Sequence, residues 1–184
     1  MNQPNLIIVS GIVCTGKTTV AKKLSETLHI PLVSKDMIKE SLFDTLGYSD
    51  REYSKKIGVG SYRVMYLLIE ELIKNKISLI TETAFSSEFD SKIFNNLISK
   101  YSPKVLQVVC ETDKEVLFPR FVARSESGER HPGHVDHVNY KEFEDKLKNE
   151  EYVPLDIVGK TIKIDTTNMD AIDYEGVLRE IERL

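Results

Sequence analysis

A glycine-rich stretch near the start of the chain constrains the fold more than any other feature. Residues 11–18 read GIVCTGKT, which matches the pattern G-x-x-x-x-G-K-[ST] at every defined position. The stretch follows the apolar, β-favouring run 6–9 and precedes apolar residues at helical spacing over 20–28. A strand, a glycine loop and a helix N-terminus in this order place backbone N–H groups and the helix dipole around an anion. The sequence therefore predicts a phosphate-binding loop in an α/β protein.

The same pattern gives expected tasks to individual residues of the loop. Lys17 is expected to reach the β- and γ-phosphates of ATP, and the Thr18 hydroxyl is expected to bind Mg²⁺. The residues expected to contact the nucleotide here are Gly11, Cys14, Thr15, Gly16, Lys17, Thr18 and Thr19. The alternative is a glycine turn with an exposed lysine, which the agreement of motif and context disfavours.

Short apolar runs alternate with helical patterns along the rest of the chain. The expected strands are 6–9, 31–33, 77–81, 105–110 and 161–164. Helical spacing of apolar residues indicates helices around 20–28, 38–43, 57–73, 89–98, 143–147 and 177–181. Five strands alternating with helices predict a parallel sheet covered on both faces. The length of 184 residues suits a single domain, 1–184, with a core of its own.

Two local signals concern the helix expected after the fourth strand. Thr112 and Glu115 have the spacing of a capping box, which predicts a helix start at this point. Pro119 falls inside the same helix and is expected to kink or split it.

Charge and cysteine content exclude several classes of protein. The 25 Lys and Arg against 29 Asp and Glu give a net charge of −4, which argues against a general nucleic-acid binder. The two cysteines, Cys14 and Cys110, form no disulfide framework and are expected to be free thiols in a reducing cytoplasm. We see no signal peptide, and no apolar run approaches the about 20 residues that span a bilayer.

Two carboxylates follow expected strands at the sheet edge where ligands bind. Asp36 comes after the second strand and is our candidate for accepting the proton of a hydroxyl acceptor. Its alternative role is to cap a helix starting at Met37. Glu82 closes the third strand and could support Mg²⁺ through water or bind a substrate hydroxyl. Its alternative is an exposed carboxylate at a strand end.

Basic residues gather between positions 120 and 130. Arg120 and Arg124 are four residues apart and therefore share a helix face, and Arg130 follows on a loop. Arginines supplied by a lid can neutralise charge on a transferred phosphoryl group. The alternative is a solvated helix face with Glu126 and Glu129 as ion-pair partners.

A histidine-rich loop follows these arginines. His131, His134 and His137 recur every three residues, with Asp136 among them. The dipeptide at 132–133, Pro-Gly, interrupts any helix, and the spacing is not that of a helical zinc site. Contacts to substrate or turn hydrogen bonds are therefore the favoured interpretation.

These motifs together resemble a known group of enzymes. The segments SGIVCTGKTT at 10–19, SKD at 34–36, ITET at 80–83, and RFVAR with GERHPGH within 120–134 are similar to the AAA_33-like, polynucleotide-kinase-like P-loop kinases. That group also includes chloramphenicol-phosphotransferase-like and zeta-toxin-like enzymes.

The resemblance implies a fold and a set of site residues. The fold is the three-layer α/β/α sandwich of P-loop NTPases, with sheet order 2-3-1-4-5 and a lid over about 119–138. The implied ligands are ATP and Mg²⁺. The implied base is Asp36, the implied lid arginines are Arg120 and Arg124, and a loop near adenine carries Asp165 and Thr167.

The sequence thus predicts a kinase that uses ATP and Mg²⁺ to phosphorylate a hydroxyl of a small molecule, as a monomer or homodimer. The segments 43–66 and 125–139 are expected to line the acceptor site. One alternative is a regulatory protein that hydrolyses ATP slowly without an acceptor. The other is a 5′-hydroxyl polynucleotide kinase, which the acidic net charge disfavours.

Overall fold

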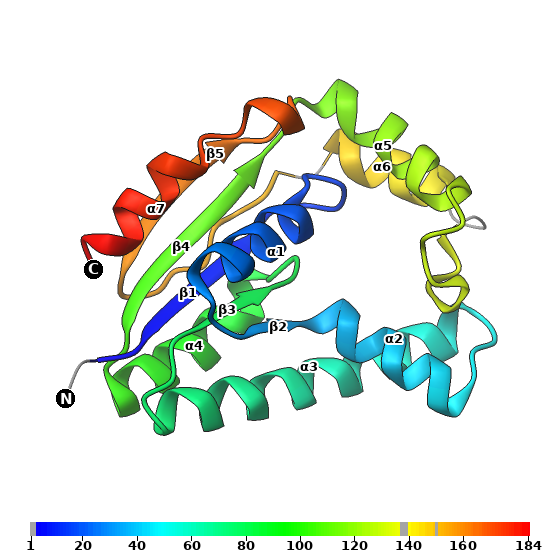
Figure 1. Cartoon of the computed structure of the whole chain (residues 1–184). Helices are drawn as coiled ribbons and strands as arrows, with labels where there is room; N and C mark the ends of the chain where they lie inside the picture. The colour runs from blue at the N-terminus through cyan, green and yellow to red at the C-terminus, as the bar shows by residue number, and fades with distance from the viewer. Residues whose placement is uncertain (1–2, 137–139, 150) are drawn as a thin grey trace.

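Five parallel strands form the central sheet, in the order β2-β3-β1-β4-β5 (Figure 1). The computed structural model describes residues 3–136, 140–149 and 151–184. The strands are β1 (Asn5–Ser10), β2 (Leu32–Ser34), β3 (Leu79–Glu82), β4 (Lys104–Glu111) and β5 (Lys160–Asp165). The predicted parallel sheet and its order are confirmed.

Helices cover both faces of this sheet (Figure 1). They are α1 (Lys17–Leu28), α2 (Lys35–Leu46), α3 (Arg51–Lys74), α4 (Ser87–Tyr101), α5 (Lys114–Glu126), α6 (Tyr140–Asn149) and α7 (Tyr174–Glu182). Two short 3₁₀ turns are η1 (Pro132–His134) and η3 (Met169–Ala171). No helix within the described ranges is long and apolar enough to cross a membrane.

The sheet is buried on both faces because successive side chains of β1 point in opposite directions. Ile7 and Val9 pack into a cluster with residues of α1 and α7. Leu6 and Ile8 pack into a second cluster with residues of α3 and α4. All four side chains are fully buried. The continuous apolar run at 6–9 therefore reflects a central strand between two helical layers.

A third, smaller cluster joins α5 and α6 to the glycine-rich loop. Leu117, Phe121 and Leu147 pack together with Cys14 of the loop. The rings of Phe121 and Phe143 stack at 4.2 Å. Figure 1 shows α5 and α6 side by side, with the chain between them running toward α2. This arrangement places residues 127–136 against α2.

Two expectations about α5 need correction. The helix begins at Lys114 with Asp113 at the N-cap, so the predicted capping box does not form. The Thr112 hydroxyl lies 2.7 Å from the Thr166 hydroxyl, a tertiary partner that replaces the local cap. Pro119 does not split the helix, which continues through it to Glu126. The proline is exposed on the helix surface.

Candidate active site

The loop between β1 and α1 has the backbone geometry that its glycines predict. Gly11 and Gly16 have φ of 146° and 78°, values that favour glycine. A Cβ on Gly11 would lie 2.6 Å from the Cys110 carbonyl oxygen. The Thr15 hydroxyl and the Lys17 ammonium donate to the Ile12 carbonyl at 2.9 and 3.1 Å. The loop is therefore tightly curled, with Lys17 folded back over it.

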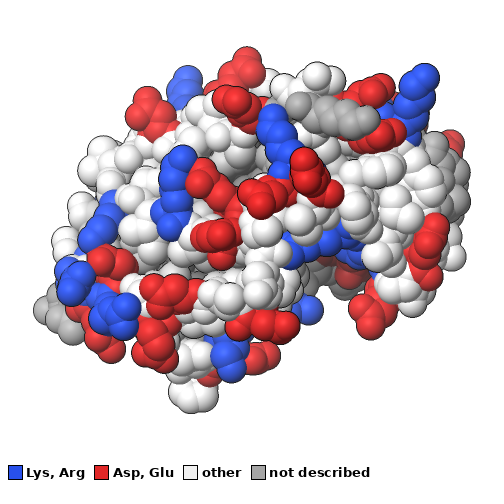
Figure 2. Space-filling view, turned by 90° about the horizontal axis from the view of Figure 1, so that it is seen from above, with Lys and Arg blue, Asp and Glu red and all other residues white. Residues whose placement is uncertain are grey.

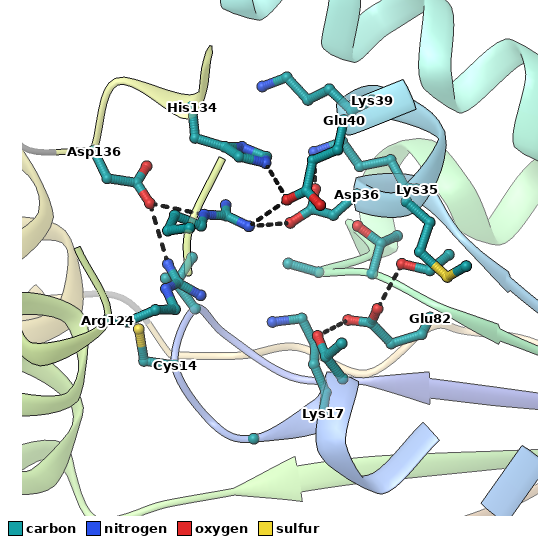
Figure 3. A pocket seen from close by; sticks show the side chains of 18 of the residues that line it. Cys14, Lys17, Lys35, Asp36, Lys39, Glu40, Glu82, Arg124, His134 and Asp136 are labelled. Atoms are coloured by element: carbon teal, nitrogen blue, oxygen red, sulfur yellow. Dashed lines mark hydrogen bonds and ion pairs between the residues drawn. The ribbon is translucent and has the colours of Figure 1, made fainter. Parts of the chain in front are cut away.

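A cavity of about 650 Å³, called here the main cavity, opens in front of this loop at the carboxyl edge of the sheet. It collects side chains from α1, α2, α3, β3 and α5 and from the segment after α5 (Figure 3). The predicted site residues that line it are Cys14, Gly16, Lys17, Thr18, Thr19, Asp36, Glu82, Arg120 and Arg124. The topology therefore brings residues from four distant stretches of sequence into one space.

Four predicted residues do not line the main cavity. Gly11 and Thr15 lie within the curled loop itself. Asp165 and Thr167 line a separate shallow depression beyond β5. The Thr167 amide donates to the Asp165 carboxylate at 2.8 Å, which turns the chain where it leaves the strand.

Glu82 is buried at the end of β3, 3% exposed, so the alternative of an exposed carboxylate is wrong. Its Oε1 accepts a hydrogen bond from Thr18 at 3.2 Å, and its Oε2 accepts one from Ser34 at 2.9 Å (Figure 3). Register places Ser34 of β2 beside Glu82. A hydroxyl and a carboxylate side by side are hard oxygen ligands of the kind Mg²⁺ prefers, so these residues fit that ion.

Asp36 lies in the first turn of α2 and does not cap it. The helix begins at Lys35 with Ser34 at the N-cap, so the predicted start at Met37 is wrong. The Asp36 carboxylate accepts hydrogen bonds from Lys35 at 2.8 Å and from Arg130 at 3.1 Å. Burial alone would raise the pKa of Asp36, but Lys35 and Arg130 outweigh it and hold the pKa well below its usual range. Asp36 is therefore ionised at neutral pH.

The two arginines of α5 have different partners. Arg120 donates to the Thr166 and Thr167 carbonyls at 3.0 and 2.7 Å, which ties α5 to the segment after β5. Arg124 donates to Asp136 at 3.4 Å. The alternative of ion pairs with the glutamates 126 and 129 is wrong, because Arg120 and Arg124 bond to the segment after β5 and to Asp136 instead.

Arg130 holds a more central place than its sequence position indicates. It donates to Asp36 and Asp136 at 3.1 Å each and to Glu40 at 3.4 Å. Two of these partners lie in α2, more than 80 residues earlier in the sequence. From the sequence, Arg130 is expected only to lie on a loop beyond Arg120 and Arg124. No local pattern could have found this network, because only the tertiary path of the loop creates it.

Comparisons with known proteins agree with this architecture. The AAA_33 model, described as an AAA domain, matches residues 6–149. The chain belongs to the AAA_33 family. No curated protein matches the sequence.

Solved structures that are similar to this AAA_33 protein include kinases. A "putative kinase" from Chloroflexus aurantiacus J-10-fl is 32% identical, with a TM-score of 0.89 over 99% of this chain and 98% of that one. The PezAT toxin–antitoxin structure from Streptococcus pneumoniae is 16% identical, with a TM-score of 0.59 over 95% and 72%. Shikimate kinase from Bacteroides thetaiotaomicron is 15% identical, with a TM-score of 0.50 over 98% and 99%. The last two similarities concern the fold alone.

The histidine loop of this AAA_33 protein packs against α2. The His134 ring nitrogen Nε2 lies 2.9 Å from Glu40, and burial lowers the pKa of His134. A neutral His134 therefore donates to the Glu40 carboxylate. The His131 ring stacks on Phe43 at 5.2 Å. Across the described ranges no group of three His, Cys, Asp or Glu is suited to a metal, and His137 lies outside those ranges.

Proposed function

We propose that this protein is a kinase that uses ATP and Mg²⁺ to phosphorylate a hydroxyl group of a small molecule. The observation that carries the proposal is that Asp36, ionised by its basic partners, lines the same cavity as Lys17 of the phosphate loop. A phosphate donor held by the loop and a hydroxyl held by Asp36 would meet within this space.

The loop residues are proposed to hold the nucleotide. Backbone N–H groups of the curled loop and the start of α1 bind phosphate oxygens, and Lys17 reaches the β- and γ-phosphates. Thr18 holds Mg²⁺, with Glu82 supporting it through water. When bound, Mg²⁺ neutralises negative charge on the two outer phosphates.

Asp36 is proposed to orient the acceptor and take its proton. Its lowered pKa makes it a weak base, so it does not remove the proton before the reaction begins. In a loose transition state the bond from the γ-phosphorus to ADP is largely broken before the acceptor oxygen bonds to phosphorus. The acceptor proton then passes to Asp36, which leaves ADP and a phosphate monoester.

The segment about 119–138, of which residues 137 and 138 lie outside the described ranges, is proposed to act as a lid. Arg124 and Arg130 line the main cavity and would place positive charge near the transferred phosphoryl group. Arg120 joins the lid to the carbonyls of Thr166 and Thr167. Asp165 and Thr167 are proposed to lie beside the adenine ring of the nucleotide. Closure of the lid would exclude water and suppress hydrolysis of ATP.

The charge pattern on one face of the molecule favours a small acceptor over a polynucleotide. On the face seen in Figure 2, Lys and Arg are interspersed with Asp and Glu. A polynucleotide acceptor would require a stripe of positive charge along its phosphates.

The test is phosphate transfer from ATP to a panel of hydroxylated metabolites, measured as product and as ADP. We expect Lys17→Ala to abolish both. Asp36→Asn should still bind ATP but should transfer phosphate about 10² to 10⁴ times more slowly. Glu26→Gln, an exposed change on α1, should retain the wild-type rate. ADP formation that no acceptor stimulates would contradict the kinase, and unchanged transfer by Asp36→Asn would contradict the base assignment.

A further inference from the structure

A lysine in the wall of the main cavity has no carboxylate partner. Lys39 lies three residues after Asp36 on α2, lines the main cavity and is only 8% exposed. Its ammonium donates to the Ser54 hydroxyl at 2.9 Å and lies 5.2 Å from the centre of the Phe43 ring. Among the described residues no Asp or Glu pairs with it, although Lys35 and Arg130 both have carboxylate partners. Lys39 is therefore a buried cation held by a hydroxyl and an aromatic ring.

This environment is unfavourable for a charged ammonium. Burial and the positive charges of Lys35 and Arg130 lower the pKa of Lys39 to about 8, and Asp36 and Asp136 offset this only in part. A buried charge without a counter-ion loses its hydration and gains little in return. An anion in the cavity beside Lys39 would supply the missing partner.

The position of Lys39 relative to Asp36 limits where that anion would lie. The two residues are three apart on α2, so they share a helix face with a rise of about 4.5 Å between them. In Figure 3, Lys39 extends beyond Asp36 as seen from Lys17. Lys39 thus lies on the acceptor side of Asp36, away from the phosphate loop. Its charged neighbours are Lys35, Asp36, Arg130 and Asp136, none of which belongs to that loop.

The charge of the cavity indicates how much negative charge it can take. Eight Lys and Arg and five Asp and Glu of the described residues line it, and His134 is neutral because burial lowers its pKa. The lining therefore carries about three net positive charges. ATP with one Mg²⁺ retains about two negative charges, which leaves about one for the acceptor to balance. A singly charged carboxylate fits this remainder better than a phosphate group does.

We propose that Lys39 binds the carboxylate of the acceptor, so that the substrate is a small hydroxylated carboxylic acid. Its hydroxyl would face Asp36, and its carboxylate would lie about one helical turn further along α2. The assignment of the hydroxyl and the charge balance rest on the proposed kinase activity, whereas the presence of an anion site rests on the burial and contacts of Lys39.

A purely structural Lys39 is the competing explanation. Through Ser54 and Phe43 the lysine links α2 to α3, so its removal could disturb the cavity in general. Such a disturbance would lower the kcat/KM of acidic and uncharged acceptors to the same extent. A carboxylate-binding lysine instead changes the preference between them, and the experiment measures that preference.

The experiment uses aldonic acids, hydroxy amino acids and cyclic hydroxycarboxylic acids, each paired with its primary amide, and sugar monophosphates as a third arm. Transfer from ATP gives kcat/KM, and the melting temperature with a non-hydrolysable ATP analogue and Mg²⁺ gives binding without turnover. The variants are Lys39→Met, which keeps the length of the side chain, and Lys39→Arg, which keeps its charge. Lys56→Met, an exposed change on α3, is the control.

We expect at least one acid to be used with a kcat/KM at least 10-fold above that of its amide. Lys39→Met should lower kcat/KM for that acid about 10- to 100-fold, the contribution of one charged hydrogen bond, and should leave the amide and nucleotide binding unchanged. Lys39→Arg should recover part of the loss, and Lys56→Met should match the wild type.

Several results would overturn the carboxylate site: equal use of acids and amides, equal losses for both in Lys39→Met, a preference for sugar monophosphates, or no acid that binds. Acids that stabilise the wild type but not Lys39→Met, without any transfer of phosphate, would support the carboxylate site and contradict the kinase. The preference for acids over amides therefore tests the carboxylate site, and the transfer of phosphate separately tests the kinase activity.

Discussion

The Arg130 guanidinium donates a hydrogen bond of 3.1 Å to the Asp36 carboxylate across 94 residues of sequence. The same guanidinium reaches Glu40 and Asp136, so one cation holds three carboxylates together at the edge of the main cavity. This contact joins the proposed lid to the proposed acceptor-binding helix, and together with Lys35 it keeps the pKa of Asp36 low.

Removal of Arg130 should change the pH dependence of the reaction. Lys35 and Arg130 both lower the pKa of Asp36, so the loss of Arg130 should raise that pKa while the effect of Lys35 remains. In Arg130→Met the rate should therefore begin to fall at a higher pH on acidification than in the wild type, and kcat at neutral pH should fall at least about 100-fold. The measurement is the pH profile of phosphate transfer.

Arg63→Met, which changes an exposed arginine of α3, is the control and should leave the profile in place. An unshifted acid limb in Arg130→Met would show that Arg130 does not lower the pKa of Asp36 during the reaction.

His134 should make the protein less stable in mildly acidic solution. Burial holds the pKa of His134 below its ordinary value of 6.5, so the unfolded chain binds a proton more readily than the folded one. Stability should therefore fall as pH drops below about 6.5 and should level off below the folded-state pKa. In His134→Gln, whose amide can still donate to Glu40, this part of the fall should be absent. The measurement is the free energy of urea unfolding at several pH values between about 5 and 8.

Equal slopes of stability against pH in the two proteins would contradict a neutral, buried His134. His29→Gln, at the exposed end of α1, is the matched control and should keep the wild-type slope.

Gly133 allows the histidine loop to approach α2 closely. A Cβ at this position would lie 2.5 to 2.8 Å from ring atoms of Phe43, which is 1% exposed and has no room to move away. Gly133→Ala should therefore destabilise the protein by about 1 to 3 kcal/mol and loosen the contact between Arg130 and Asp36. Denaturant unfolding measures the first effect, and kcat measures the second.

Gly60→Ala is the control, because nothing lies within 4 Å of a Cβ added there on α3. It should leave kcat unchanged and stabilise the helix by about 0.5 to 1 kcal/mol. A Gly133→Ala protein as stable and active as the wild type would contradict the close packing of the loop on Phe43.

Pro119 should cost stability without contributing packing. It lies inside α5 on an exposed position, where it cannot donate the hydrogen bond that the helix ladder requires. Pro119→Ala should therefore raise the free energy of unfolding by about 1 to 3 kcal/mol. Unfolding in urea tests this, and a lower stability for Pro119→Ala would indicate that the proline supports the helix in its present path.

Residues close together in sequence explain the part of the site that could be predicted. The conformation of the stretch 11–18 depends on its own residues, because glycines at 11 and 16 permit positive φ and the adjacent apolar runs form a strand and a helix. The sequence also predicts that Asp36 and Glu82 lie at the site, since they stand at the ends of two strands and parallel strands end at one edge of the sheet. The start of α5 was missed because a tertiary partner, Thr166, replaced the local cap of Thr112.

By itself the sequence determined the phosphate loop, the alternation of strands and helices, and the acids that follow the strands, because each depends on local backbone preference and periodic burial. Only the tertiary structure decided that Arg130 meets Asp36, that Glu82 bonds to Ser34 and Thr18, and that Lys39 is buried without a carboxylate. These contacts join segments far apart in the chain, and the packing of α5 and α6 on the loop and of residues 127–136 on α2 sets which side chains meet. Local patterns carry no information about that path.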